Sequence, residues 1–143
     1  MTNEQIERCD ALWRELLAAG KVRWMGGMLA RADGWQPLRL AVEFLTSVWS
    51  GIAGDAVGHD YAHNVGDDAA PVWTDPATIG CLVAMAREAW EDAGMTAHGS
   101  YSHQGRRWCL IGGHAHGRAF KSLAERTFDT EAEALLLAIK AAR

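Results

Sequence analysis

Two pairs of histidines have spacings that suit metal ligation. His59 and His63 stand four positions apart, so on a helix both imidazoles would share one face, and Asp60, Asp67 and Asp68 offer carboxylate oxygens nearby. The glycines around this pair disfavour a helix, and no glutamate follows the first histidine to act as the base of a zinc hydrolase. Ordinary loop histidines are therefore favoured over a metal site.

The second pair, His114 and His116, would share one face of a strand, which also suits a metal ion or a phosphate. Gly112, Gly113 and Gly117 surround this pair and favour a turn instead. Nothing in the sequence requires the two pairs to meet in space. A histidine-dependent metal enzyme is thus the weakest hypothesis, and we expect no cofactor.

Arginine adjoins tryptophan at Arg23–Trp24 and again at Arg107–Trp108, in segments predicted to be strands. An indole stacks on a nucleobase and a guanidinium neutralises phosphate, so these four residues are the candidate ligand-binding residues. Neighbouring strand residues point to opposite faces, so a site would combine an arginine with an aromatic residue of another element, or lie at a subunit interface. Most of the seven tryptophans must nevertheless be core.

No residue pattern specifies catalysis. The sequence lacks the Gly-x-Ser-x-Gly motif that presents a serine nucleophile. Its three cysteines are odd in number and form no Cys-x-x-Cys pair, so we interpret Cys9, Cys81 and Cys109 as small buried hydrophobes. These observations favour a protein that is not an enzyme.

Composition indicates a soluble protein. The 143 residues are 49% hydrophobic and carry a net charge of −4, which argues against nonspecific binding of nucleic acid. No apolar run is long enough to cross a bilayer and the first residues lack a signal-peptide pattern, so we expect no membrane contact and a cytoplasmic location.

Three helices are signalled by their N-terminal caps. Thr2 with Gln5 and Thr130 with Glu133 form capping-box patterns, and Asp75 precedes a proline that suits the first helical position. Glycines at positions 20 and 94 are expected to end the first and middle helices. The apolar faces comprise Ile6, Cys9, Trp13, Leu16 and Leu17 in the first, Ile79, Leu82, Val83, Ala86 and Trp90 in the middle, and Ala132, Leu135, Leu136 and Ile139 in the last.

Strands are predicted between these helices. Residues 101–111 fit a hairpin that turns at Gln104–Gly105, and residues 118–128 fit a further strand. Residues 21–30 and 35–42 fit a strand pair around an Asp33–Gly34 turn. The next segment, 43–52, suits either a short helix or a buried strand. Residues 51–71 suit a mobile loop.

The expected fold is therefore α+β: a small antiparallel sheet flanked by N-terminal, middle and C-terminal helices. We expect residues 1–143 to form one domain, with the core in 72–143.

Residues 75–90, the tryptophan-bearing hairpin and residues 129–142 together resemble small phage and prophage proteins, including those grouped as the phage ABA-sandwich domain. Residues 24–29 are similar to the N-terminal part of some of them. The resemblance implies a sheet flanked by helices, a phage gene and expression in the host cytoplasm. It carries no catalytic residues.

The favoured hypothesis is a phage-encoded, non-enzymatic accessory protein, active in counter-defence, that binds a small nucleotide-like ligand and forms a homo-oligomer. The first alternative is an interaction protein that occludes a host protein, with the acidic 55–68 segment as its contact. The second alternative is the histidine-dependent metal enzyme.

Overall fold

The computed structural model describes residues 1–34, 36–40, 65, 68–103, 105–113 and 117–143. Backbone contacts divide the chain into two compact units. One comprises residues 1–22 and 82–143, and the other comprises residues 23–81.

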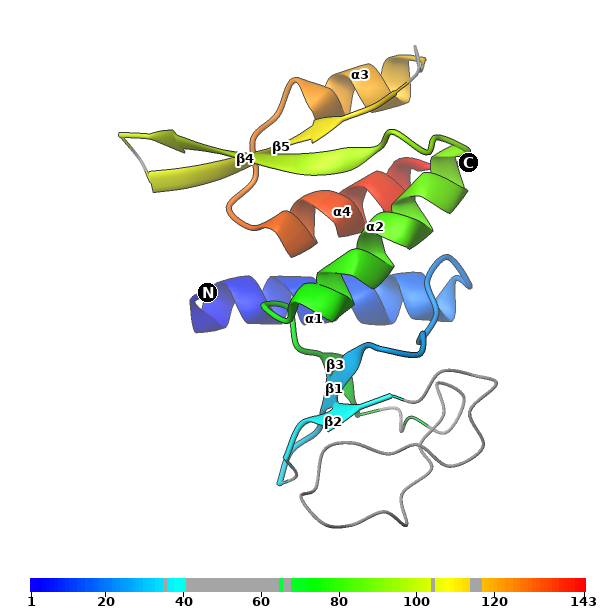
Figure 1. The fold of residues 1–143 in the computed structure, drawn as a ribbon, viewed down its shortest axis with the longest axis vertical. Coiled ribbons are helices and arrows are strands. Elements are labelled where there is room, and N and C mark those ends of the chain that lie inside the picture. The colour runs from blue at the N-terminus through cyan, green and yellow to red at the C-terminus, as the bar shows by residue number, and fades with distance from the viewer. Residues whose placement is uncertain (35, 41–64, 66–67, 104, 114–116) are drawn as a thin grey trace. The chain divides into compact units, whose positions relative to one another are not determined.

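The fold is α+β, as the sequence predicts (Figure 1). Within the described residues, four helices accompany a three-stranded and a two-stranded antiparallel sheet. The helices are α1 (Asn3–Ala18), α2 (Pro76–Trp90), α3 (Arg118–Ala124) and α4 (Glu131–Ala141). The strands are β1 (Leu29–Arg31), β2 (Leu38–Arg39), β3 (Ala70–Pro71), β4 (Thr96–Ser102) and β5 (Gly105–Ile111).

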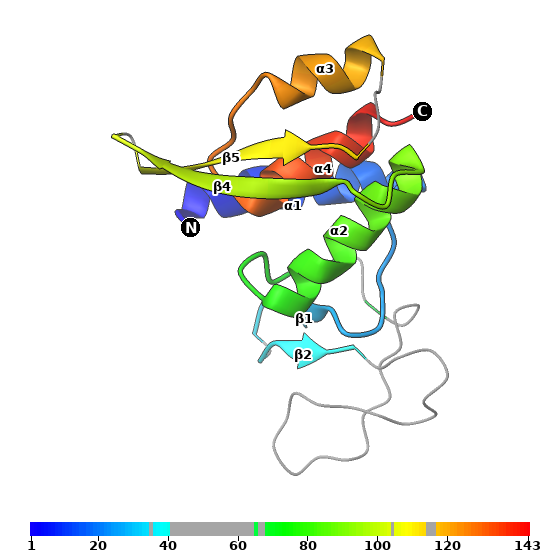
Figure 2. The ribbon, with the colours of Figure 1, turned by 45° about the horizontal axis from the view of Figure 1, so that its top comes forward.

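In the larger unit, the β4–β5 ribbon packs on α4, and α4 packs on α1 (Figure 2). Helices α1 and α4 run side by side in the same direction, because Arg8 lies 3.3 Å from Glu133 and Lys140 lies 2.8 Å from Glu15. The core of this unit contains side chains that are at most 1% exposed, including Cys9, Trp13, Leu16, Leu82, Met95, Leu135, Leu136 and Ile139. The N-terminal helix therefore contributes to the core alongside the residues after position 72.

The caps of α1 and α2 are those that the sequence predicts. Thr2 and Gln5 each accept a hydrogen bond from the other's backbone amide, which completes a capping box. The Asp75 carboxylate accepts the Thr78 amide at 2.8 Å, and Pro76 is the first residue of α2.

Half of the capping box predicted for α4 is confirmed, because the Thr130 hydroxyl accepts the Glu133 amide at 3.1 Å. The Glu133 carboxylate, expected to complete the box, lies beside Arg8 of α1. The ion pair between Glu133 and Arg8 therefore links α4 to α1.

Two details of the helix predictions are wrong. Helix α2 ends at Trp90, and the residue that takes the left-handed conformation is Glu91 (φ 50°), not Gly94. Leu17, expected on the buried face of α1, is 37% exposed. Gly20 does adopt the predicted left-handed turn after α1, with φ 70°.

The predicted hairpin is confirmed and is longer than expected. β4 begins at Thr96 instead of Tyr101, and it pairs with β5 from Thr96↔Ile111 to Ser102↔Gly105. The predicted strand over residues 118–128 is wrong, because residues 118–124 form α3. Phe120 and Leu123, three positions apart, are both buried, as one face of a helix requires. Only Phe128 forms a β-bridge, with Trp108.

The smaller unit holds the three-stranded sheet, in the order β2-β1-β3. Strands β1 and β2 form the predicted pair, with Gly34 at φ 79° in the turn between them, although each strand is shorter than expected. Ala70 belongs to β3 and not to the predicted loop. Trp35, the segment 43–52 and most of the predicted loop lie outside the described residues.

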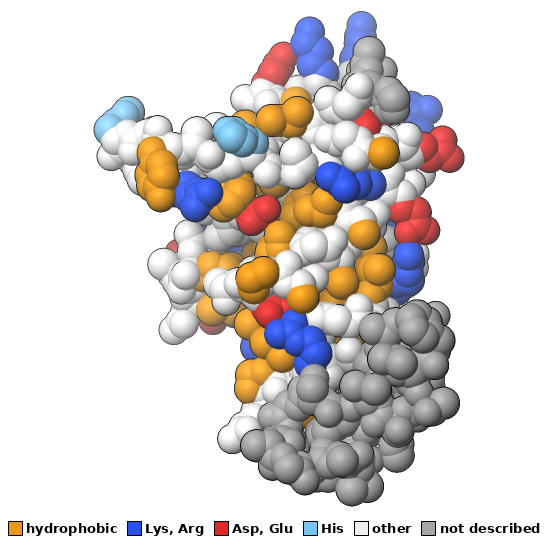
Figure 3. All heavy atoms as spheres, in the orientation of Figure 1, with side chains coloured by type: hydrophobic (Ala, Val, Ile, Leu, Met, Phe, Trp, Pro, Cys, Tyr) orange, Lys and Arg blue, Asp and Glu red, His pale blue; other side chains and the backbone are white. Residues whose placement is uncertain are grey.

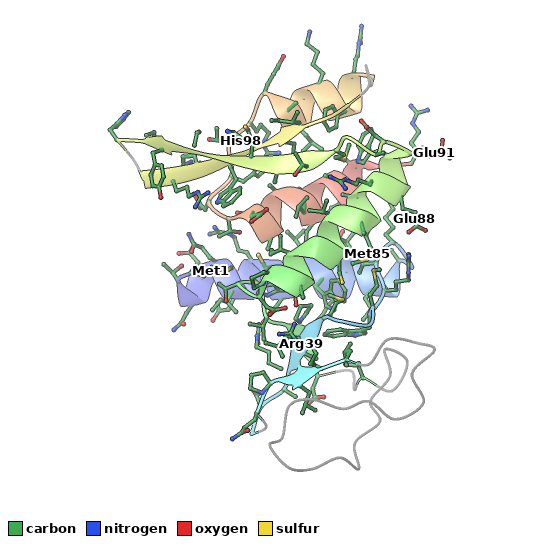
Figure 4. The ribbon with its side chains drawn as sticks, viewed as in Figure 1. Met1, Arg39, Met85, Glu88, Glu91 and His98 are labelled. Atoms are coloured by element: carbon green, nitrogen blue, oxygen red, sulfur yellow. The ribbon has the colours of Figure 1, made fainter. Side chains whose placement is uncertain are left out.

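An ion pair ties this sheet to the start of α2. Arg39, labelled in Figure 4, donates to both Asp75 oxygens at 2.6 and 2.8 Å and to the Gly27 carbonyl at 2.9 Å. The Thr78 hydroxyl donates to Asp75 at 2.9 Å and accepts the Leu29 amide at 3.0 Å. Asp75 thus acts as a helix cap and as the anchor of β2.

Candidate functional site

An arginine stacks between two aromatic rings on one face of the β4–β5 ribbon. The Arg106 guanidinium lies 4.6 Å from the centre of the Trp108 ring and 5.5 Å from that of Tyr101. Arg106 and Tyr101 are cross-strand partners, while Arg106 and Trp108 are two residues apart on β5, so all three side chains share a face. We refer to Tyr101, Arg106 and Trp108 as the ribbon stack.

The backbone makes room for this arrangement at Gly99, which pairs with Trp108. A Cβ atom at this position would lie 2.6 Å from Arg106 Nε, too close for the guanidinium to keep its place. Trp108 is fixed in turn by two backbone hydrogen bonds with Phe128, of 2.9 and 2.8 Å. The ribbon stack is therefore built on a defined backbone.

The ribbon stack is open to solvent. Tyr101 is 82% exposed, Arg106 is exposed and Trp108 is half-buried. Among the described residues, no carboxylate forms an ion pair with Arg106. The positive charge of Arg106 acts on Glu131: burial raises the pKa of that carboxyl, and Arg106 partly offsets the effect. Arg106 thus keeps a cation available beside an exposed aromatic ring.

Arg107, the arginine chosen from the sequence, lies on the opposite face of β5. Its guanidinium forms an ion pair with Asp129 and donates to the Thr127 hydroxyl at 3.2 Å. Arg8 donates to the other Asp129 oxygen at 2.9 Å. In this structure Arg107 thus holds the segment before α4 against the ribbon, and Trp108 stacks with Arg106 instead.

Arg23 and Trp24 belong to the unit of residues 23–81, whereas Arg107 and Trp108 belong to the other unit. Trp24 is 9% exposed and contributes to its unit's core, while Arg23 is exposed. The strand predicted at Arg23–Trp24 is wrong, because β1 begins only at Leu29, although the two side chains do differ in burial as expected. A largely buried indole offers little stacking surface.

The four candidate metal-binding histidines, His59, His63, His114 and His116, lie outside the described residues. Elsewhere in the chain, the described residues contain no group of three or more His, Cys, Asp or Glu side chains placed to hold a metal ion.

A buried carboxylate explains the double glycine at positions 112 and 113. Asp92 is 1% exposed and accepts the amides of Gly94 and Gly113, at 2.9 and 2.7 Å. A Cβ atom at Gly113 would lie 2.7 Å from an Asp92 oxygen, and one at Gly112 would lie 3.0 Å from the Phe120 ring. Asp92 therefore has a structural role in joining the entry to β4 with the exit from β5.

A shallow groove of about 800 Å³ lies where the end of α2, the start of α3 and the end of α4 meet. It is lined by Glu88, Ala89, Trp90, Glu91, Gly117, Arg118, Ala141 and Arg143, and Figure 4 labels Glu88 and Glu91 at the end of α2. Its charged side chains are of both signs. The groove is therefore the weaker candidate for a ligand site, because its lining favours neither charge sign.

Outside the groove, the surface also carries charges of both signs. Figure 3 shows Lys and Arg side chains interspersed with Asp and Glu over the described part of the visible face. No helix among the described residues is both long and apolar enough to cross a membrane.

Comparison with known proteins adds no relative: no family model, curated protein or solved structure matches this chain. The candidate site therefore depends on the geometry of the ribbon stack.

Proposed function

We propose that this is a non-enzymatic binding protein that holds a nucleotide-like ligand on the ribbon stack. The observation that carries the proposal is the position of Arg106, which stacks on Trp108 and on the 82%-exposed Tyr101. An exposed tyrosine ring offers a face for a nucleobase, and a guanidinium beside it offers planar donors to a phosphate. The expected ligand therefore combines a planar base with a negatively charged phosphate.

The Arg106 charge supports this assignment over a purely structural role. Arg107, one residue away, is neutralised by Asp129, but Arg106 forms no ion pair with a described carboxylate. A stacked arginine is weakly hydrated and partly ordered, so it loses less conformational freedom when it binds phosphate. We therefore assign the ligand-binding cation to Arg106 in place of Arg107, and retain Trp108.

The resemblance to phage ABA-sandwich proteins supports the biological setting that we propose. In that setting the protein is phage-encoded, acts in the host cytoplasm and sequesters a nucleotide signal of host defence.

The test is a binding screen against mononucleotides, cyclic mononucleotides and cyclic dinucleotides, by thermal shift and then by calorimetry. Arg106→Ala and Tyr101→Ala should each weaken binding by about tenfold or more, since base stacking contributes about 1–3 kcal/mol. Arg106→Lys keeps the charge but loses the planar group, so it should restore only part of the affinity.

Arg126→Ala is the matched control. Arg126 is also exposed and lies 5.3 Å from an aromatic ring, but that ring belongs to Phe128, which is 3% exposed and offers no free face. Binding should be unchanged in this variant. Binding that survives both Arg106→Ala and Tyr101→Ala would refute the site, and binding of none of these compounds would refute the ligand class.

The alternative is occlusion of a host protein, which is favoured by two exposed apolar side chains on the ribbon. Ile111 is 45% exposed and lies on the face opposite Tyr101. If the nucleotide screen fails, pull-down of one host protein that Ile111→Ser and Tyr101→Ser abolish would establish this alternative.

A further inference from the structure

Strand β4 has one edge that is free of any described strand, which we call the free edge. It pairs with β5 along all seven of its residues, and no strand in the described part of the chain pairs with its other side. A strand edge carries a row of unpaired amides and carbonyls, which is a template for another strand.

The β-bridge between Trp108 and Phe128 shows which residues of β4 direct their amides and carbonyls toward the free edge. Trp108 uses both its amide and its carbonyl to bond Phe128, so neither points toward β4. Gly99 and Trp108 are therefore a non-hydrogen-bonded pair of the antiparallel ladder. It follows that Gly99 directs its amide and carbonyl to the free edge, and alternation makes Ala97 and Tyr101 do the same.

This edge lacks the features that usually prevent strand pairing. Natural edge strands are commonly protected by lysine, by other charged side chains or by proline. The β4 sequence, Thr96-Ala-His-Gly-Ser-Tyr-Ser102, contains no Lys, Arg, Asp, Glu or Pro. At seven residues it is also long enough to support a stable ladder.

We propose that β4 pairs with β4 of a second copy of the chain, antiparallel about a two-fold axis at Gly99. Gly99 is the central residue of the strand, with three residues on either side. This register pairs Gly99 with the partner's Gly99, and Ala97 with the partner's Tyr101. Every residue that directs its backbone outward then meets another, which forms about six new hydrogen bonds.

The side chains fit the same register. On the face of the ribbon stack, the large Tyr101 lies opposite a small residue, Ala97 of the partner subunit, which is 8% exposed because α4 covers that end of the ribbon. On the other face, His98 lies opposite Ser100 of the partner subunit, so no two charged side chains of one sign meet. A foreign peptide would need a complementary sequence, whereas β4 supplies its own complement.

The dimer converts two ribbons into one four-stranded sheet, in the order β5-β4-β4-β5. Two-stranded ribbons are marginally stable alone, and sheets of four strands are common. This inference depends on the strand edge and not on the proposed ligand, so it stands or fails separately from the proposed function.

The test uses two double variants at His98 and Ser100, which are exposed and lie outside the ribbon stack. Ser100 pairs with Arg107 within its own chain, so the Tm and the circular dichroism spectrum of each variant are measured first to show that the ribbon is intact. H98K/S100K places a lysine opposite a lysine of the partner at two points. H98K/S100E changes the same two positions but places a lysine opposite a glutamate. By light scattering with size exclusion, wild type and H98K/S100E should be dimers, while H98K/S100K should dissociate at least about tenfold more readily.

Hydrogen exchange of the wild-type chain tests the register without any substitution. The amides of Ala97, Gly99 and Tyr101 should become protected as protein concentration rises through the dimerisation range. Those of His98 and Ser100, which bond β5, should not respond. A monomeric wild type, a dimer that H98K/S100K leaves intact, or a folded H98K/S100E that stays monomeric would each overturn the proposal.

Discussion

Asp75 links the start of α2 to strand β2 in the smaller unit. It caps α2 through Thr78 and holds Arg39 with two hydrogen bonds, and its side chain is 9% exposed. The hydrogen bond from Arg39, together with those from Thr78, lowers the pKa of Asp75 to about 2 despite the opposing effect of burial.

Asp75 should make the stability of the protein depend on pH in the acid range. Because the folded-state pKa of Asp75 lies below its ordinary value of about 4, its stabilising effect is complete above pH 4 and lost as pH falls toward 2. Asp75→Asn should lower the free energy of unfolding at pH 7 by about 1–2 kcal/mol, allowing for the partial exposure of Arg39.

Urea unfolding from pH 2 to 7 measures this effect. Asp75→Asn should also flatten the pH dependence between pH 2 and 4. Glu4→Gln is the control, since Glu4 pairs with Arg8 on an exposed helix surface and should change stability by less than about 0.5 kcal/mol. Equal acid sensitivity of wild type and Asp75→Asn would contradict the prediction.

At the scale of the element, α4 is central to the larger unit, because it packs on α1, α3 and both strands of the ribbon. Leu135 on this helix is fully buried. Leu135→Asp should unfold or aggregate the protein, since an unpaired buried charge costs several kcal/mol, comparable with the stability of a small domain.

Leu17→Asp is the matched control for this prediction, because Leu17 is a helical leucine that is 37% exposed. It should stay folded with a small loss of stability. Thermal unfolding followed by circular dichroism distinguishes the two variants. A soluble Leu135→Asp protein with an unchanged Tm would contradict the packing of α4 against the ribbon.

The elements that the sequence predicts are those with local signals. The starts of α1, α2 and α4 depend on a side chain within three residues of the helix, so Thr2, Asp75 and Thr130 identify them. The start of α3 carries no such signal, because its N-cap is Gly117, which has no side chain to accept a hydrogen bond.

The candidate site is predictable in part for the same reason. Residues 106 and 108 share a face by strand alternation alone, so the stacking of Arg106 on Trp108 could be deduced from the sequence. The ion pair that occupies Arg107 involves Asp129, which is 22 residues away, and no local pattern indicates it. Long-range pairing thus determines which arginine stays available.

For the whole molecule, the smaller unit is built from a three-stranded sheet with short strands, and the larger unit from helices on a ribbon. One boundary between the units falls between Val22 and Arg23, after α1, and the other falls between Cys81 and Leu82, inside helix α2. Each unit contributes buried hydrophobic side chains, such as Met28 in the smaller unit and Leu135 in the larger.

The whole-molecule prediction is that folding needs no metal. Native mass spectrometry should give the mass of the chain without zinc, manganese or nickel, and a chelator should leave the Tm unchanged, because structural metals contribute directly to folding. A stoichiometric metal that is lost when His59, His63, His114 or His116 is replaced by alanine would instead support the metal-enzyme alternative.

The three cysteines differ in burial, so they should react with a thiol-directed label at different rates. Cys9 is fully buried, and burial raises the pKa of its thiol to about 11, so almost no thiolate is present at neutral pH. Burial also raises the pKa of Cys81. Cys109 is half-buried on β5 directly opposite His98, so a maleimide dye attached there would lie on the ribbon one strand in from the outer edge of β4, and no engineered cysteine is needed.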